Sequence, residues 1–286
     1  MKHTSQPPYA DLHCHSTCSD GSATPQQLVQ LAVQKGLKAL SITDHDNIDA
    51  YTIAKPIADA ANLLLISGVE FSSQLQDKSI HILGYGVDCK NAELIAFCNH
   101  HHARRIQRCR RILDKLTLHG MPLSEQDLYI SDEMATNTEI VSIGRPHMAM
   151  GMLRKGYVSS IQEAFVKFLG DGKPFYLPVE SVTPEETIKV IHKANGVAVI
   201  AHPHLIPNST ILLELLKMPF DGIECFYGTF KPSSCARFRK IADRRNWLKT
   251  GGSDYHGSAK PHQHLGSNGV DENDFKLLQE KIRDRS

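Results

Sequence analysis

The sequence predicts an α/β fold in which seven strands close into a barrel. Two observations carry this prediction. Short apolar stretches alternate with helix signals along much of the chain, and histidine or carboxylate residues follow nearly all of these stretches. Such alternation predicts parallel strands with right-handed crossovers, and a closed barrel brings the loops after its strands to one end. The alternative is an open doubly wound sheet, which would gather such residues from two or three strands rather than six.

Cap signals and apolar runs define the elements of the first part of the chain. Thr24, Pro25 and Gln27 form a capping box with proline at the first helical position, and Gly36 ends this helix. Apolar side chains at helical spacing predict a second helix over residues 48–61. The expected strands begin at residue 9 and then cover residues 37–42, 63–66 and 80–85.

The alternation stops after the fourth strand. Residues 91–180 show helical patterns and no convincing strand, which predicts a helical insertion domain between barrel parts at 1–90 and 181–286. A second capping box at Thr183 marks the point where the alternation resumes. Further helices are expected at 183–196, 209–217, 232–245 and 272–284, and further strands at 197–200, 222–226 and 247–250.

Composition restricts the class of protein. The chain of 286 residues is 41% hydrophobic and 22% charged with a net charge of +1, so it is an ordinary globular sequence without a global basic field for nucleic acid. No secretory signal or membrane-spanning run is evident. Seven scattered cysteines leave at least one unpaired, which predicts reduced thiols and a cytoplasmic location.

The first candidate site follows the first strand. Alternation along a strand places His13 and His15 on one face about 7 Å apart, and Cys14 on the other. Two imidazoles so arranged can bind one metal ion, although such a pair alone is weak evidence.

Matching residues recur at or just after the other strands. The complete candidate set is His13, His15, Asp20, His45, Glu70, His81, His202, Asp254 and His256. Imidazole and carboxylate donors without thiolates suit Mn²⁺, Fe²⁺ or Zn²⁺. Nine donors exceed the need of one ion, and the two carboxylate oxygens of Glu70 could bridge ions. Each residue alone could be structural, but independent core histidines would not all follow strands.

The motifs that hold these residues resemble those of the polymerase-and-histidinol-phosphatase (PHP) family. They are Asp11-Leu12-His13-x-His15-Ser16, Ser19-Asp20-Gly21, Thr43-Asp44-His45, Gly68-Val69-Glu70, Ala201-His202-Pro203 and Gly252-Ser253-Asp254-x-His256. The resemblance implies a distorted (β/α)7 barrel and a centre of three divalent ions, with Mn²⁺ favoured. By the family pattern, the three ion sites would be His13, His15, Glu70 and Asp254; Asp20, His45 and His256; and Glu70, His81 and His202.

The long insertion and the Gly144-Arg145-Pro146-His147 segment resemble the family branch of 3′,5′-nucleoside bisphosphate phosphatases and 5′→3′ exoribonucleases. The insertion would then be a lid over the metal centre. Arg145 and His147 become candidate substrate-binding residues, since arginine offers a planar fork to phosphate and imidazole can donate or transfer a proton. The alternative is an ordinary helix start with a surface arginine.

Other polar residues permit two interpretations each. Arg104, Arg108 and Arg111 share a helix face, which could follow a polyanion or could simply be solvated. Glu224, at the end of the sixth strand, could support the metal site or contact substrate.

The resulting hypothesis is a metal-dependent phosphoesterase in which a metal-bound hydroxide, rather than a side chain, attacks phosphorus. The resemblance implies a nucleotide or a short RNA as the substrate, with no membrane and no obligate protein partner. A histidinol phosphatase is one alternative, although it would not need an arginine-lined insertion. A non-catalytic metal-binding accessory module is another, but every ligand position of the family pattern is filled here.

Overall fold

A seven-stranded sheet forms the centre of the molecule. The structure is a computed structural model that describes residues 8–128, 144–170, 172–177, 182–206, 208–227 and 232–285. Some sequence-based expectations concern residues outside these ranges. These residues are 1–7, together with 129–143, 171 and 178–181 in or beside the predicted insertion. The strands, hydrogen-bonded in chain order, are β1 (Ala10–Asp11), β2 (Ala39–Ile42), β3 (Leu64–Leu75), β4 (Lys78–Tyr85), β5 (Val197–Ile200), β6 (Gly222–Tyr227) and β7 (Leu248–Gly252).

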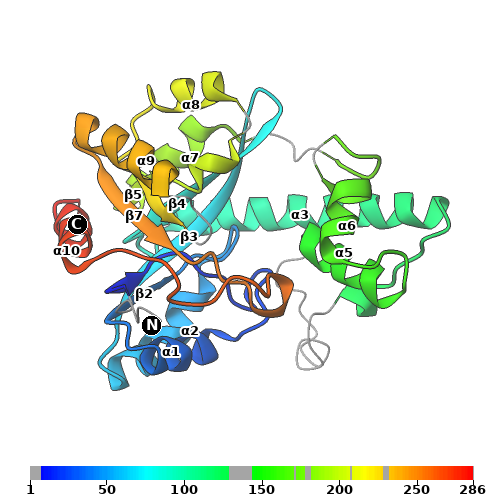
Figure 1. Ribbon diagram of the computed structural model, residues 1–286, viewed down its shortest axis with the longest axis horizontal. Coiled ribbons are helices and arrows are strands. Elements are labelled where there is room, and N and C mark those ends of the chain that lie inside the picture. Colours follow the sequence, from blue (N-terminus) through cyan, green and yellow to red (C-terminus); the bar gives the residue numbers. More distant parts are fainter. Residues whose placement is uncertain are drawn as a thin grey trace.

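Helices surround the sheet and extend from it on one side (Figure 1). They are α1 (Pro25–Gln34), α2 (Asp49–Ala60), α3 (Ala92–Leu118), α5 (Arg145–Arg154), α6 (Ile161–Ala164), α7 (Pro184–Lys193), α8 (Ser209–Leu215), α9 (Pro232–Arg245) and α10 (Glu272–Arg283), with shorter turns η1 (Glu125–Leu128), η2 (Phe165–Leu169), η3 (Pro203–Leu205) and η4 (Gly257–Ala259). Both predicted capping boxes are present, at Thr24 and at Thr183.

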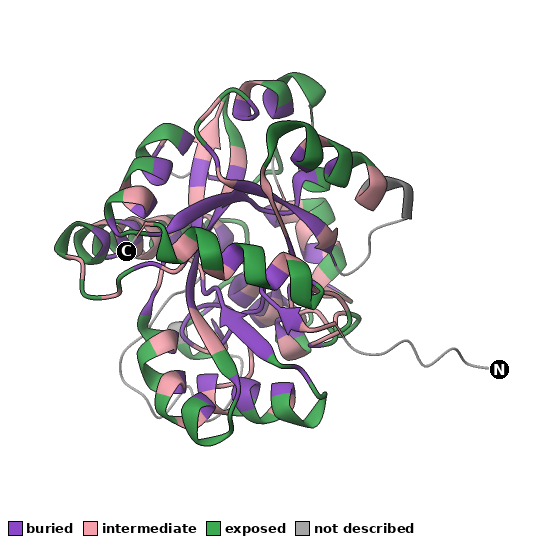
Figure 2. Ribbon diagram, turned by 90° about the vertical axis from the view of Figure 1, so that its left-hand side faces the viewer, coloured by how far each residue is buried: buried purple, intermediate pink, exposed green. Residues whose placement is uncertain are grey.

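Most neighbouring strands are parallel, as predicted. The pairs β1–β2, β2–β3, β5–β6 and β6–β7 are all parallel. Every residue of β2 and β5 is buried, as expected for strands that are covered on both faces. Figure 2 shows mostly buried strands with helices around them.

The prediction of a uniformly parallel barrel is wrong at β4, which is antiparallel to both β3 and β5. The cause is a tight hairpin: β3 extends to Leu75, and Gln76 and Asp77, both with positive φ, turn the chain directly into β4. A parallel neighbour would need a crossover of a dozen or more residues at this point. The third strand is therefore much longer than its apolar run at residues 63–66 indicated.

Hydrogen bonds between the first and last strand regions nearly close the barrel. The Leu12 amide donates to the Gly251 carbonyl at 3.1 Å, and the Asp254 amide donates to the His13 carbonyl at 2.8 Å. Cys14 and Tyr255 form an isolated parallel bridge beyond these contacts. Chain segments that are some 240 residues apart thus meet at one end of the barrel.

A helical segment made of α3, η1, α5, α6 and η2 extends from the barrel (Figure 1). Within this segment, α3 forms the connection to the barrel. Its 27 residues span about 40 Å. Near its start, Leu94 and Cys98 pack in the barrel core, whereas Ile112 and Leu116 pack with Met148 in a second core. The described residues of this segment contain no strand, as expected. The division at 91–180 into separate domains stays a prediction.

Candidate metal centre

All nine predicted donor residues lie around one end of the barrel. His13 and His15 follow β1, His45 follows β2, His202 follows β5, and Asp254 follows β7. Glu70 and His81 instead lie inside β3 and β4, because this hairpin continues past the end of the other strands. Seven of the nine are almost fully buried, while His45 and His81 are partly exposed.

One group of donors consists of His13, His15, Glu70 and Asp254. A carboxylate oxygen of Glu70, Oε2, lies 3.3 Å from His13 Nε2 and 3.2 Å from His15 Nε2. Asp254 Oδ1 lies 3.5 Å and 3.3 Å from the same two nitrogens. This group has the same four members as the first ion site that the family resemblance implied.

A second group surrounds Asp20. Asp20 Oδ1 lies 3.3 Å from His256 Nε2 and 3.6 Å from His15 Nδ1, and Asp20 Oδ2 lies 3.7 Å from His45 Nε2. The expected members Asp20, His45 and His256 are therefore together, with His15 as an additional neighbour.

A third group consists of His45, Glu70 and His81, and here the arrangement differs from the expected set. Glu70 Oε1 contacts His81 Nδ1 at 3.0 Å and His202 Nε2 at 2.8 Å, so His202 reaches the same carboxylate but falls outside the compact group. His15 and His45 each border two groups. A neutral imidazole has one lone-pair nitrogen, so each of them can serve only one ion.

The chemistry of these donors fits divalent cations. His13 Nε2, both ring nitrogens of His15, and His45 Nδ1 are buried without a hydrogen-bond partner among the described residues. An unsatisfied buried nitrogen is costly, and a metal ion would satisfy it. Burial opposes ionisation of Glu70, yet the surrounding imidazoles, first of all His45 and His13, hold its pKa well below the ordinary value.

The protonation of His15 indicates the same need for positive charge. Burial lowers its pKa, but Asp254 and Glu70 raise the pKa of His15 to about 9. These two carboxylates thus favour the cationic form of the His15 imidazole. A divalent ion would supply that charge instead, and its binding would release the proton.

Hydrogen bonds outside the donor groups orient the rings. His13 Nδ1 lies 3.0 Å from Glu224 Oε1, which turns Nε2 towards Glu70 and Asp254. Glu224 Oε2 also accepts from the His202 amide at 2.6 Å. Glu224 thus orients two ligand candidates, which agrees with the interpretation that it supports the metal site. Cys14 points away from the site into the core beside α1 and α2, as predicted.

The backbone is strained at the same loops. Among the described residues, His202 and Asp254 have positive φ values of 24° and 51°, and Asp46, next to His45, has a φ of 54°. Residues other than glycine rarely adopt this region, and such strain is concentrated at functional sites.

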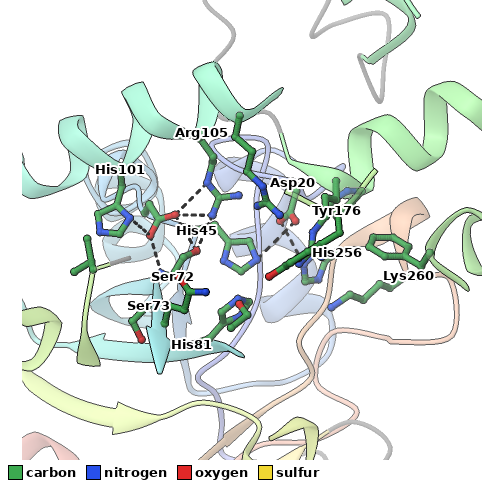
Figure 3. A pocket seen from close by; sticks show the side chains of 18 residues that line it. Asp20, His45, Ser72, Ser73, His81, His101, Arg105, Tyr176, His256 and Lys260 are labelled. Carbon is green, nitrogen blue, oxygen red and sulfur yellow. Dashed lines mark hydrogen bonds and ion pairs between the residues drawn. The ribbon is translucent and has the colours of Figure 1, made fainter. Parts of the chain in front are cut away.

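A cavity of about 250 Å³ opens beside the donor groups (Figure 3). Asp20, His45, His81 and His256 line it on the barrel side. Cationic and aromatic side chains complete the lining: Arg105, Arg108, Arg145, Tyr176 and Lys260. The volume is slightly below the usual range for small-molecule pockets. The four cationic side chains in the lining favour an anionic ligand.

The two predicted substrate residues occupy different positions. Arg145 lines the cavity, where its guanidinium lies over the Tyr176 ring at 5.3 Å and donates to the Leu169 carbonyl at 3.2 Å. His147 is buried, and its Nδ1 accepts from the Gly144 amide at 3.0 Å. Burial lowers the pKa of His147 to about 4. The ring is therefore neutral with its proton on Nε2, which suits a hydrogen-bond donor better than a proton carrier.

The arginine face that the sequence indicated on α3, with Arg104, Arg108 and Arg111, coincides only in part with the cavity lining. Arg105 and Arg108 line the cavity, whereas Arg111 is exposed. Arg105 forms an ion pair with Asp46, and its Nε–Oδ2 distance is 3.0 Å. This ion pair joins α3 to the loop that follows His45. The one sequence signal for the pair was that Asp46 is adjacent to the ligand candidate His45.

Lys260 and Tyr227 were also missed. Both contact the second carboxylate oxygen of Asp254, and the Lys260 Nζ–Asp254 Oδ2 distance is 2.6 Å. Lys260 carries no local motif. Its position four residues after His256 was the one available signal.

Comparison with known proteins finds relatives that cover most of this chain. The model of the PHP domain matches residues 11–139. A 5′-3′ exoribonuclease from Haemophilus influenzae is 32% identical over 86% of this chain and 89% of its own length. A 3′,5′-nucleoside bisphosphate phosphatase from Chromobacterium violaceum is 30% identical over 86% of both chains. A phosphoribosyl 1,2-cyclic phosphate 1,2-diphosphodiesterase from Eggerthella lenta is 29% identical over 90% of this chain and 97% of its own.

A solved structure is similar over nearly the whole chain. It is that of a presumed metal-dependent phosphoesterase from Bifidobacterium adolescentis, with a TM-score of 0.86 and 29% identity over 96% of this chain and 97% of that one. The protein is therefore a hydrolase of phosphate esters. It belongs to the PHP family.

Proposed function

We propose that this phosphoesterase acts on nucleotides, removing a phosphate from 3′,5′-nucleoside bisphosphates or the 5′-terminal nucleotide from short RNA. The observation that carries the proposal is the composition of the cavity. Metal-donor residues form one part of its wall, and Arg105, Arg108 and Arg145 form another. A ligand that fills it would meet a Lewis-acid centre and guanidinium groups at once, which suits a substrate with more than one phosphate.

We propose three divalent ions, with Mn²⁺ favoured, held by the three donor groups. The oxygen and nitrogen donors without thiolate also suit Fe²⁺ or Zn²⁺. When bound, such ions lower the pKa of a shared water and neutralise charge on phosphoryl oxygens. Glu70 would bridge ions, because its two oxygens face different histidines. His202 would complete the third group through its contact with the Glu70 carboxylate.

The arginines of the helical segment would bind the substrate's phosphates. The pKa of Arg108 falls to about 10, first because of burial and then because of the neighbouring charges of Arg145 and Arg105. Its Nε is buried without a partner among the described residues. An anion between these guanidinium groups would relieve their repulsion and satisfy that donor. His147 is buried outside the cavity lining, so its predicted contact with substrate has no support in the described cavity.

The residues around the cavity also support the proposed lid role of the helical segment. Its side chains approach the donor groups across the cavity, and bound substrate would lie between the two parts.

No described helix is long and apolar enough to cross a bilayer. All seven cysteines are described and none forms a disulfide, which supports the proposed cytoplasmic location.

Product analysis with purified protein and added Mn²⁺ tests the proposal. The substrates are adenosine 3′,5′-bisphosphate, a short 5′-phosphorylated RNA, a cyclic ribose phosphate and histidinol phosphate. Preferred turnover of the first or second is expected. Preferred turnover of histidinol phosphate or of the cyclic ester would replace the proposed substrate class, and no release from any of them would favour a non-catalytic module.

A further inference from the structure

The carboxylate of Asp254 is divided between two environments. Oδ1 faces His13 and His15, whereas Oδ2 accepts hydrogen bonds from the Tyr227 hydroxyl and from Lys260 Nζ. In this contact the Tyr227 hydroxyl is the donor, because a carboxylate oxygen can only accept. Tyr227, which is buried and does not line the cavity, thus orients the Asp254 carboxylate.

Lys260 differs from Tyr227 in its access to the cavity. It lines the cavity beside Asp20 and His256, and 40% of its side chain is exposed (Figure 3). An ammonium group has three donor hydrogens, and Asp254 is its one partner among the described residues. Two donors can therefore turn to a ligand without loss of the contact with Asp254.

The position of Lys260 complements that of the arginines. Arg105 and Arg108 come from α3 and Arg145 from α5, all in the helical segment, whereas Lys260 comes from the loop after β7 on the barrel itself. It is the one lysine that lines the described cavity. A phosphoryl group next to Asp20 and His256 would therefore have a cation on the barrel side that does not depend on the position of the helical segment.

We propose that Lys260 is a catalytic residue that binds an oxygen of the phosphoryl group under attack, in addition to its contact with Asp254. The inference rests on the proposed arrangement of metal-donor residues, but it does not depend on the nucleotide part of the substrate. The ammonium donates hydrogen bonds and keeps its proton throughout. Its charge offsets the negative charge that gathers on the phosphoryl oxygens in the transition state.

Two variants separate contact with substrate from support of Asp254. Lys260→Met keeps the length of the side chain and removes its charge, whereas Tyr227→Phe removes the other donor to Asp254 Oδ2. Lys55→Met on α2, whose ion pair with Asp59 is exposed, is the matched control for loss of a lysine charge. Melting curves by circular dichroism confirm that each variant is folded.

The measurements are metal content after dialysis, affinity for inorganic phosphate by calorimetry, and kcat/KM for 4-nitrophenyl phosphate. Lys260→Met is expected to retain its metal, to bind phosphate about tenfold more weakly and to lose at least tenfold in kcat/KM. Tyr227→Phe is expected to lose metal instead. Lys260→Arg, which keeps the charge, should recover part of the phosphate affinity.

Two results would overturn the role of Lys260. One is phosphate affinity equal to that of the wild type in Lys260→Met, and the other is metal loss equal to that of Tyr227→Phe, which would make it a positioning residue only. Neither probe contains a nucleoside. A wild-type protein that is active on 4-nitrophenyl phosphate but inert towards nucleotides would therefore refute the proposed substrate class and leave this comparison intact.

Discussion

Glu70→Gln should inactivate the enzyme while the barrel stays folded. The substitution keeps the shape of the side chain but removes a charge whose oxygens lie 2.8–3.3 Å from nitrogens of five histidines. Glu70 belongs to two of the three donor groups, so its loss weakens both. If the ions there supply about 4 kcal/mol of transition-state stabilisation, kcat/KM falls about a thousandfold, at 1.36 kcal/mol for each factor of ten.

The assay combines metal analysis, kcat/KM and thermal unfolding with and without Mn²⁺. An ion at a hundred times its Kd stabilises the folded protein by about 2.7 kcal/mol, which corresponds to a rise of roughly 4–5 °C in Tm for a chain of this size. Wild-type protein should show this rise, and Glu70→Gln should show little of it. Glu93→Gln, at an exposed ion pair with Lys193, is the control and should change kcat/KM less than twofold. Full activity and unchanged metal content in Glu70→Gln would refute the bridging role.

Three further predictions concern the surroundings of the site. Arg145→Ala should raise KM at least tenfold with metal content unchanged; an equal loss of metal would make Arg145 a structural residue. Arg105→Ala removes the arginine partner of buried Asp46 and leaves it with His101 and Ser72, so the free energy of unfolding should fall by about 3 kcal/mol in urea titrations. An unchanged free energy of unfolding would count against a stabilising role of the Arg105–Asp46 pair. Burial opposes ionisation of Asp221, but hydrogen bonds from His192 and the Ala198 amide, with Arg285, keep its pKa below the ordinary value. Its ionised form therefore stabilises the fold above about pH 4, and this contribution is lost as the pH falls lower. Asp221→Asn should cost about 2 kcal/mol at pH 7 and progressively less below pH 4, whereas a deficit independent of pH would refute the linkage.

Local patterns were sufficient for most elements and for the identity of the donors. Capping boxes at Thr24 and Thr183 fix helix starts through contacts within three residues, so short-range sequence predicts them well. The donor set could be named because strands deliver their following loops to one end of a barrel. The antiparallel β4 was missed because a hairpin and a crossover differ in connection length, and the apolar run at residues 63–66 concealed how far β3 continues.

The sequence by itself determined the alternation of strands and helices, the nine clustered donors and the family. Only the tertiary structure decided which ring nitrogens lack partners, that Glu224 orients His13, and that Lys260 and Arg105 reach the cavity. The physical reason is distance along the chain. Glu224 meets His13 across 211 positions, and Arg105 meets Asp46 across 59. Contacts of this kind arise from barrel closure and from the docking of α3, which leave no periodic or local signal in the sequence.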